Sequence, residues 1–236
     1  MRAPLTPLTL IIVAIATAPA IAACPTSTYL YGGLDPATPI VEYAPANDTT
    51  FRVQPCETMH GRYQLNAGLL LASTSGCAVG SSFPAVTGLE TIVEDDFTVT
   101  GLPAGTPVGF DAVLELDGEA FSSGEPGGGG GGRVRGLIYE TLTNQVSLQQ
   151  GTTGQLSSIT VHQPLTLHVD ALAGTPVRLR FSVRGECLDG VARMEGTFHF
   201  ANLPPGAFVQ SCRGYTSAAP VPARPSTWGR LKTSHR

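Results

Sequence analysis

Strict alternation of apolar and polar residues is the feature that most limits how this chain can fold. In residues 177–184 every odd position is apolar and every even position is polar. Successive side chains of a β-strand point to opposite faces, so this segment is predicted to be a strand with one face on a core and the other in water. Residues 108–117, 165–170 and 192–200 alternate in the same way, and helical periodicity is almost absent. The chain is therefore predicted to be all-β.

The alternation also predicts which side chains point into the core. They are Val108, Phe110, Ala112, Leu114, Leu116, Leu165, Leu167, Val169, Val177, Leu179, Phe181, Val183, Met194, Phe198 and Phe200. Less regular strands are predicted over residues 38–43, 50–54, 62–72, 86–94, 133–142, 155–162 and 207–212. About ten short strands separated by turns are typical of an antiparallel two-sheet β-sandwich with Greek-key or jelly-roll topology. A chain of this length can bury one complete core, which favours a single domain.

Proline and glycine mark the connections between strands. Residues 102–105 (LPAG) and 203–206 (LPPG) each have Pro second and Gly fourth, the pattern of a type I turn. The five residues AGTPV occur at 104–108 and again at 173–177, each time leading into an alternating strand. Two origins fit this repeat: a duplicated hairpin, or the same turn reached twice.

The first 23 residues have the composition of a secretory signal peptide. Arg2 gives a positive start, residues 8–16 form an apolar stretch too short to span a bilayer, and Ala20-Ile21-Ala22 is an A-x-A cleavage site. No later segment is long and apolar enough to cross a membrane, so we predict export to the periplasm, cell surface or medium. Residues 21–24 (IAAC) also resemble a bacterial lipobox, which makes Cys24 a candidate for lipidation. Otherwise Cys24 remains a thiol or pairs with another cysteine.

The other four cysteines suit an oxidising compartment. Cys56, Cys77, Cys187 and Cys212 form no C-x-x-C pair, which argues against a zinc ribbon or a thioredoxin-like redox motif. Four cysteines allow three pairings. We predict the local pairing, Cys56 with Cys77 and Cys187 with Cys212, because each bond would close a loop long enough to hold two adjacent strands.

Charge is distributed unevenly along the chain. Between Cys24 and Cys212, eight arginines stand against all eighteen acidic residues, whereas residues 213–236 carry five basic residues and no acidic one. Such an acidic body argues against nucleic-acid binding, which needs a basic face. Residues 216–226 are rich in Ala and Pro, as in extended linkers. The predicted organisation is a signal peptide over 1–23, a β-sandwich over 24–215, and a linker with a basic tail over 216–236.

Familiar catalytic motifs are missing from the sequence. The glycine run within residues 122–132 matches G-x-G-x-x-G, but a strand rather than a helix is predicted after it, so a flexible loop is favoured over a dinucleotide site. There is no G-x-S-x-G elbow, and serines such as Ser81 and Ser82 lie in predicted turns. No catalytic residue is therefore predicted.

Histidines are the first candidates for a site without a motif. His162 and His168 are predicted on neighbouring strands, Asp170 lies on the same face as His168, and His199 points outward from another strand. Imidazoles beside a carboxylate can bind zinc or transfer protons. No H-x-H or H-E-x-x-H spacing occurs, so histidines on a solvated sheet face are the favoured interpretation, and no metal is predicted.

Carboxylates cluster in two places. Glu94, Asp95 and Asp96 are predicted at the end of one strand. The second set lines the outer face of another strand and comprises Asp111, Glu115, Asp117 and Glu119. Oxygen-rich loops can hold calcium, and paired carboxylates can hydrolyse glycosides. Since no D-x-D-x-D-G loop occurs and such charges also keep a sheet face soluble, no cofactor is predicted, with calcium as the alternative.

Tyrosines provide a further candidate surface. The six are Tyr29, Tyr31, Tyr43, Tyr63, Tyr139 and Tyr215. Flat aromatic rings suit sugar rings, so a carbohydrate-stacking platform is an alternative function. The single tryptophan, Trp228, lies in the tail rather than in the predicted sandwich.

The tail carries the only resemblance to known proteins. Residues 225–232 (PSTWGRLK), with 203–206 (LPPG) and 211–214 (SCRG) before them, resemble the end of certain uncharacterised exported bacterial β-sandwich proteins. This resemblance implies a secreted sandwich and carries no catalytic residues. In such a tail Trp228 and Leu231 are apolar anchors beside cations, which makes them candidates for an export or surface-retention signal. An ordinary frayed terminus is the alternative.

Taken as a whole, the sequence predicts an exported, non-enzymatic β-sandwich that serves as a surface or periplasmic binding or structural module, with protein or glycan as its partner. An extracellular hydrolase acting on a glycan or ester is the alternative. An enzyme should bring His162, His168 or two carboxylates together in a concave pocket. A binding module should instead present a sheet face with clustered tyrosines.

Overall fold

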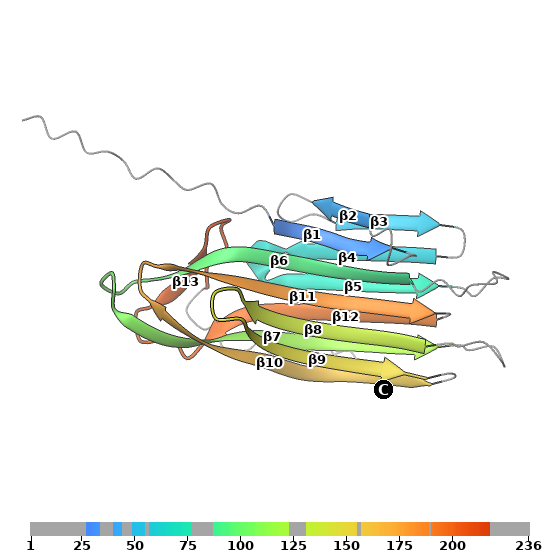
Figure 1. Ribbon diagram of the computed structural model, residues 1–236. Coiled ribbons are helices and arrows are strands. Elements are labelled where there is room, and N and C mark those ends of the chain that lie inside the picture. The colour runs from blue at the N-terminus through green and yellow to red at the C-terminus, as the bar shows by residue number, and fades with distance from the viewer. Residues whose placement is uncertain are drawn as a thin grey trace, which may run out of the picture.

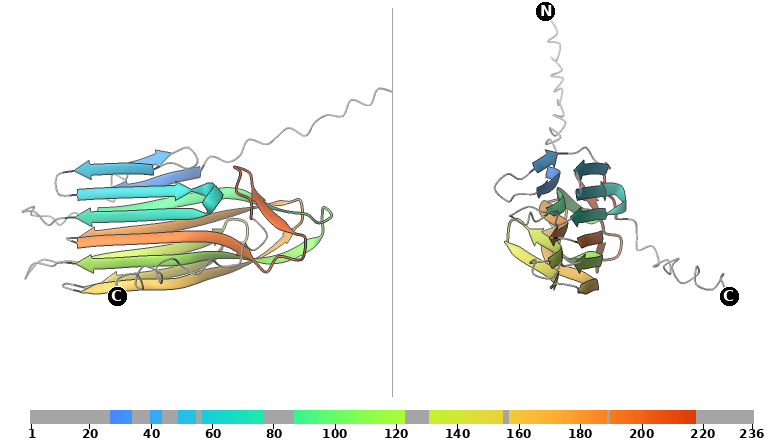
Figure 2. Two further views of the ribbon diagram at one scale, coloured as in Figure 1. Left: turned by 180° about the vertical axis from the view of Figure 1, so that it is seen from behind. Right: turned by 90° about the vertical axis from the view of Figure 1, so that its right-hand side faces the viewer.

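A computed structural model of the chain describes residues 27–33, 40–43, 49–54, 57–76, 87–122, 131–154, 157–188 and 190–217 (Figure 1). These residues form thirteen strands, arranged in two antiparallel sheets that pack face to face (Figure 2). The predicted all-β, two-sheet sandwich is thus confirmed. Among the described residues, no helix is long and apolar enough to cross a membrane.

The strands follow one another with a single short helical turn between them. They are β1 (Ser27–Gly33), β2 (Ile40–Tyr43), β3 (Thr49–Gln54), β4 (Glu57–Gln64), the 3₁₀ turn η1 (Leu65–Ala67), β5 (Leu69–Gly76), β6 (Thr87–Thr100), β7 (Pro107–Ser122), β8 (Gly131–Glu140), β9 (Gln145–Thr153), β10 (Ser158–Leu172), β11 (Pro176–Leu188), β12 (Gly190–Ala201) and β13 (Phe208–Ser211).

The strand order is that of a jelly roll. Sheet A runs β2-β1-β6-β11-β8-β9, with β13 also paired to β6, and sheet B runs β10-β7-β12-β5-β4-β3. The eight strands β5 to β12 form one long rolled hairpin, in which β5 pairs with β12, β6 with β11, β7 with β10 and β8 with β9. Successive pairs alternate between the two sheets, as in other jelly rolls. The hairpins β1–β2 and β3–β4 extend the two sheets.

The repeated AGTPV segments occupy equivalent places in this rolled hairpin. Because β6 pairs with β11 and β7 with β10, the β6–β7 and β10–β11 connections cross between the sheets side by side. The Gly105 N–H donates to the Ala173 carbonyl (2.8 Å), and the Ala173 N–H donates to the Thr106 carbonyl (2.9 Å). Each copy therefore forms the same type of connection between the two sheets and is hydrogen-bonded to the other copy.

The proline-glycine turns begin one residue later than predicted. The Thr106 N–H donates to the Pro103 carbonyl (3.2 Å), and the Ala207 N–H donates to the Pro204 carbonyl (3.0 Å). Glycine is then the third turn residue, with φ of 81° at Gly105 and 82° at Gly206. A positive φ at that position is the requirement of a type II turn, so the type I prediction was wrong.

The core lies between the sheets, and every side chain predicted to point inward is buried. Phenylalanines from both sheets meet in it: Phe181 of sheet A stacks on Phe198 of sheet B, with ring centroids 4.3 Å apart. Phe97 and Phe200 pack around this pair. Tyr215, which follows β13, closes one end of the cluster against Phe198 (5.0 Å).

Three of the differences from the predicted strands have a local cause. The segment predicted as one strand over 62–72 is a hairpin, because Gly68 turns the chain at a φ of 66° where a Cβ would lie 2.2 Å from the Phe198 carbonyl oxygen. β10 continues through Pro164, which an edge strand tolerates. β9 was missed because it is a polar edge strand with no clear alternation, on which even Val146 and Leu148 are exposed.

Candidate functional site

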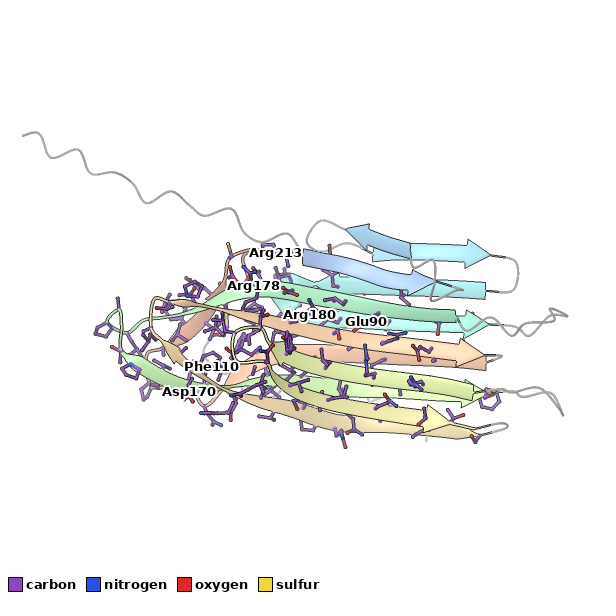
Figure 3. All side chains as sticks on the ribbon, viewed as in Figure 1. Glu90, Phe110, Asp170, Arg178, Arg180 and Arg213 are labelled. Carbon is purple, nitrogen blue, oxygen red and sulfur yellow. The ribbon has the colours of Figure 1, made fainter. Side chains whose placement is uncertain are left out.

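Ionic side chains concentrate on the outer face of sheet A. Strands β6, β8 and β11 contribute what we call the arginine ladder, five arginines over four carboxylates. Figure 3 labels Glu90, Arg178 and Arg180 of this ladder. Its members are Arg133, Arg135, Arg178, Arg180, Arg184, Glu90, Glu94, Asp96 and Glu186. The antiparallel register places Asp96 opposite Arg178, Glu94 opposite Arg180 and Glu90 opposite Arg184. Each of these three positions thus pairs opposite charges between β6 and β11.

Contacts within the ladder are close. Arg178 donates to both carboxylate oxygens of Asp96, at 2.8 and 3.1 Å. This hydrogen bonding raises the pKa of Arg178 further above its ordinary value. The Arg180 Nε donates to Glu94 Oε2 (2.6 Å). Glu90 Oε2 lies 2.9 Å from Arg135 Nη2 and 3.6 Å from Arg184 Nη1.

The carboxylate side chains of the ladder are buried more deeply than its arginine side chains. The side chains of Glu90, Glu94 and Glu186 are 10–14 % exposed, whereas those of Arg178 and Arg180 are 40 % and 35 % exposed. The carboxylates therefore lie beneath a layer of guanidinium groups. Sequence alternation predicted that arginines stripe β11 outward, but their partners on β6 are more than eighty residues away in sequence.

Glu94, Asp95 and Asp96 do not form the shared site that their spacing suggested. They lie within β6 rather than at its end, and alternation sends Asp95 to the inner face, where its side chain is fully buried. Arg213 reaches Asp95 from the loop after β13, with backbone N to Oδ2 at 3.2 Å and Nε to Oδ2 at 3.4 Å. Three arginines thus neutralise these three acids separately, which leaves them unsuited to bind one calcium ion.

Histidines and carboxylates pair on the outer face of sheet B. His162 and His168 both belong to β10, which corrects the prediction of two neighbouring strands. His168 Nδ1 lies 2.7 Å from Asp111 Oδ1, and His162 Nδ1 lies 3.1 Å from Asp117 Oδ1. Six residues of extended strand separate the two histidines by about 20 Å. They do not converge, and His199 faces Val113 in another row.

The His168 pair is embedded in a small hydrogen-bond network. Asn202 Nδ2 donates to Asp111 Oδ2 (2.5 Å), and Asp170 Oδ1 is 3.6 Å from His168 Nε2. The hydrogen bond with Asp111 raises the pKa of His168, and the bonds from His168 and Asn202 lower the pKa of Asp111. Glu115 and Glu119 lie exposed on the same face. No cluster of three or more metal-ligating side chains occurs in the described part of the chain.

A hollow of about 520 Å³ opens at the end of the sandwich where β7, β8, β10 and β11 meet. Its lining is mostly apolar and includes Leu142 and Leu172. Two carboxylates also line it: Glu140, which is buried, and Asp170, which is exposed at the rim. The Thr143 hydroxyl donates to Glu140 Oε2. This is a concave place with one buried carboxylate, and sequence reasoning did not predict it because Glu140 was assigned only to a strand.

Tyrosines divide between core and surface. Tyr63 and Tyr215 are buried, which excludes them from a sugar-stacking platform, and burial raises the pKa of Tyr215 to about 12. Tyr139 is partly exposed in sheet A, where its hydroxyl donates to Asn144 (2.6 Å). In the backbone register, Tyr29 of β1 pairs with Ile92 of β6 and with Tyr43 of β2, and Tyr31 pairs with Glu90.

The predicted Cys187–Cys212 bond is wrong. Cys187 pairs in register with Thr87 of β6, whereas the Cys212 N–H donates to the Asp96 carbonyl (2.9 Å). Nine residues of strand place the two cysteines about 30 Å apart, far beyond the 4.4–6.8 Å between the Cα atoms of a disulfide. Cys24, Cys56 and Cys77, the glycine run up to residue 130, and the tail with Trp228 and Leu231 lie outside the described residues.

Comparison with known proteins adds no family. No protein-family model matches the chain, and no curated protein matches it significantly.

Proposed function

We propose that this chain is an exported, non-enzymatic jelly-roll module that binds acidic glycans at the cell surface or in the periplasm through the arginine ladder. The observation that carries the proposal is the layering of the ladder, in which guanidinium groups cover carboxylates that are almost buried. Export follows from the signal peptide predicted over residues 1–23, and glycan is one of the partners predicted from sequence.

The layering matters because a guanidinium has more donors than one carboxylate can use. Each arginine carries five N–H donors in a planar fork that matches carboxylate groups. Arg178 directs its Nε and Nη2 donors to Asp96, and its side chain is still 40 % exposed. The carboxylate of a bound uronate sugar would accept hydrogen bonds from the guanidinium N–H groups on this exposed side. The buried acids hold each guanidinium in a fixed orientation.

Aromatic positions on the same sheet also support a sugar ligand. Tyr139 stands opposite Arg180 in the register of β8 and β11. Tyr29 and Tyr31 occupy register rows shared with Ile92 and Glu90 of β6. A sheet surface that combines planar cations with the partly exposed Tyr139 suits a charged polysaccharide better than it suits a small substrate in a pocket.

Binding to two immobilised polysaccharides tests the proposal. The native protein should bind polygalacturonate and not neutral dextran, and added salt should weaken the binding. The double variant Arg178→Gln/Arg180→Gln should lose about tenfold or more in affinity, as expected for lost charge-assisted hydrogen bonds. Arg193→Gln is the matched control, because Arg193 pairs with Glu195 on the opposite sheet.

This function would be contradicted if the native protein did not bind polygalacturonate, or if the double variant bound it equally well. Urea unfolding of each variant should accompany the assay, so that lost binding is compared only among folded proteins. Binding of a protein ligand through the ladder, without binding of polygalacturonate, would also contradict the proposal that the ligand is a glycan.

The end hollow favours one alternative, a hydrolase acting on a glycan or ester. Glu140 is buried there and Asp170 stands at the rim, so two carboxylates share a concave lining. A buried carboxyl is a candidate general acid, and glycoside hydrolysis needs a pair. If the protein releases reducing sugar or cleaves an ester, Glu140→Gln should abolish that activity, and the arginine variants should leave it intact.

A further inference from the structure

Cys212 is held at a defined point on β6. Its N–H donates to the Asp96 carbonyl (2.9 Å), and the next residue, Arg213, bonds the buried Asp95 and the Glu94 carbonyl. Tyr215 then enters the aromatic core. The loop that carries Cys212 is therefore packed on the sandwich, and the Cys212 sulfur is disulfide-bonded rather than a titrating thiol.

β13 and β1 lie in line along one edge of β6. Because β11 pairs with β6 at Phe97 and Thr98, β13, which pairs with the same two residues, must occupy the opposite edge, where β1 also pairs. β13 ends with Ser211 opposite Phe97, and β1 begins with Ser27 opposite Glu94. Figure 3 shows Arg213 beside the start of β1. Cys212 thus lies within two or three residues of strand, about 7–10 Å, of the rung that Ser27 occupies.

Chain length then limits where Cys24 can be. Cys24 itself lies outside the described residues, but it is three positions before Ser27 in the sequence, and three Cα–Cα steps span at most about 11 Å. Cys212 is within that reach. A disulfide needs its Cα atoms 4.4–6.8 Å apart, which such a short connection allows.

The other cysteines belong to the opposite end of the sandwich. Cys187 is nine residues of β6 away from Cys212, about 30 Å. Cys56 directly precedes β4 and Cys77 directly follows β5, and the β5 end at Gly76 pairs with Gly190, just beyond β11. Both are thus tied to the Cys187 end. Cys24 is the one cysteine that the chain can bring to Cys212.

We propose that Cys24 and Cys212 form a disulfide that joins the start of the mature chain to the end of the sandwich. The bond forms by thiol–disulfide exchange: one thiolate attacks a donor disulfide of the oxidising compartment, the second displaces the donor, and the donor leaves as a dithiol. The proposal rests on export. It excludes a lipid on Cys24, because a thioether-linked sulfur cannot also form a disulfide.

The prediction for Cys56 and Cys77 is compatible with this bond. Thr58 pairs with Ser75 across β4 and β5, and the two cysteines lie two residues outside that pair in the sequence. Cys56–Cys77 therefore stays the local pair predicted from sequence.

A non-reducing tryptic map of the native mature protein tests the assignment. Arginines place each cysteine in a different peptide: 24–52, 53–62, 63–133, 185–193 and 194–213 carry Cys24, Cys56, Cys77, Cys187 and Cys212 in that order. The expected result is peptide 194–213 linked to the peptide that carries Cys24. A diacylglyceryl group on Cys24, or 194–213 linked to any other peptide, would overturn the proposal. A lipid would still demonstrate export, so the two failures are distinguishable.

Cysteine variants provide a second readout. Cys24→Ser, Cys212→Ser and the double variant should all lower the melting temperature by the same amount, because each breaks the same bond. Reducing agent should lower the melting temperature of the native protein close to that of the variants. Additive losses in the double variant would show that the two cysteines act independently and would refute the bond.

Discussion

The two outer faces of the sandwich use carboxylates in opposite ways. On sheet A, Glu90 and Glu94 are nearly buried beneath arginines, which stay protonated at every ordinary pH. On sheet B, Asp111 and Asp117 pair with histidines that are more than 60 % exposed, and the hydrogen bond with Asp111 raises the pKa of His168. The first face is a permanent ionic layer, and the second is a solvated surface whose pairing depends on pH.

This difference shows that the net charge of the chain does not predict which charged groups each face exposes. The body of the chain is acidic overall, but sheet A directs guanidinium groups outward and covers its acids. Burial strengthens an ion pair and also makes the loss of one partner costly, whereas exposed pairs contribute little. The contrast between the faces predicts a graded set of mutational effects.

The largest effect is expected at Arg184, which contacts both Glu90 and Glu186. Arg184→Met keeps the aliphatic stem and removes the charge, so two nearly buried carboxylates lose a partner. We expect a loss of about 2 kcal/mol in the free energy of unfolding, since Arg135 and Arg133 still neutralise those acids in part. Urea unfolding with an unchanged slope measures it.

Arg193→Met is the matched control on sheet B. Arg193 pairs with Glu195 in the exposed setting of that face, with side chains 53 % and 39 % exposed. The expected change is about 0.5 kcal/mol or less. Equal losses for Arg184→Met and Arg193→Met would remove the distinction between the two faces.

A smaller effect is expected at Arg178, at the more open end of the ladder. Its partner Asp96 is 24 % exposed, and Arg178 itself is 40 % exposed. Arg178→Met should cost about 1 kcal/mol or less, because solvent screens this pair and hydrates the abandoned carboxylate. Raising the salt concentration should reduce the difference in free energy of unfolding between this variant and the native protein. A loss as large as that of Arg184→Met would show that the burial of an ion pair in the ladder does not determine its contribution to the free energy of unfolding.

Sequence alone predicted the local features of this fold well. Alternation in residues 108–117 and 177–184 gave the strands and their buried faces, because side-chain direction in a strand depends only on neighbouring residues. It failed where a distant partner decides the outcome. Three consecutive acids at 94–96 resemble a strand end, yet β6 continues through them because Arg178, Arg180 and Arg213 neutralise them.

The candidate sites depended even more on distant pairing. The histidines were predicted on a solvated face, as observed, but two strands were predicted over residues 155–162 and 165–170, where the edge strand β10 runs without a break through Pro164. Cysteine pairing was judged from loop length, whereas the register of β6 separates Cys187 from Cys212. Register, which the sequence does not state, decided both cases.

The smallest effect should come from His168, and its sign follows from the pKa directions. The hydrogen bond with Asp111 raises the pKa of His168 above its ordinary 6.5, so its contribution to stability is present below that value and is lost as pH rises through the folded-state pKa. The pKa of Asp111 is lowered from 3.8, so its contribution is lost only as pH falls through that lowered value. The pair therefore stabilises most between these two ordinary values.

Comparison of His168→Gln with Arg184→Met across pH tests this reasoning and the contrast between the faces. The small stability difference between the native protein and His168→Gln should shrink from about pH 5 to about pH 8, whereas the Arg184→Met difference should stay constant because arginine does not titrate there. An NMR titration of the His168 ring should show a raised pKa that falls toward 6.5 in Asp111→Asn. An unshifted His168 in the native protein would mean that water, not Asp111, is its main partner. The histidine pairs of sheet B would then be merely adjacent groups, and only sheet A would carry specific ion pairing.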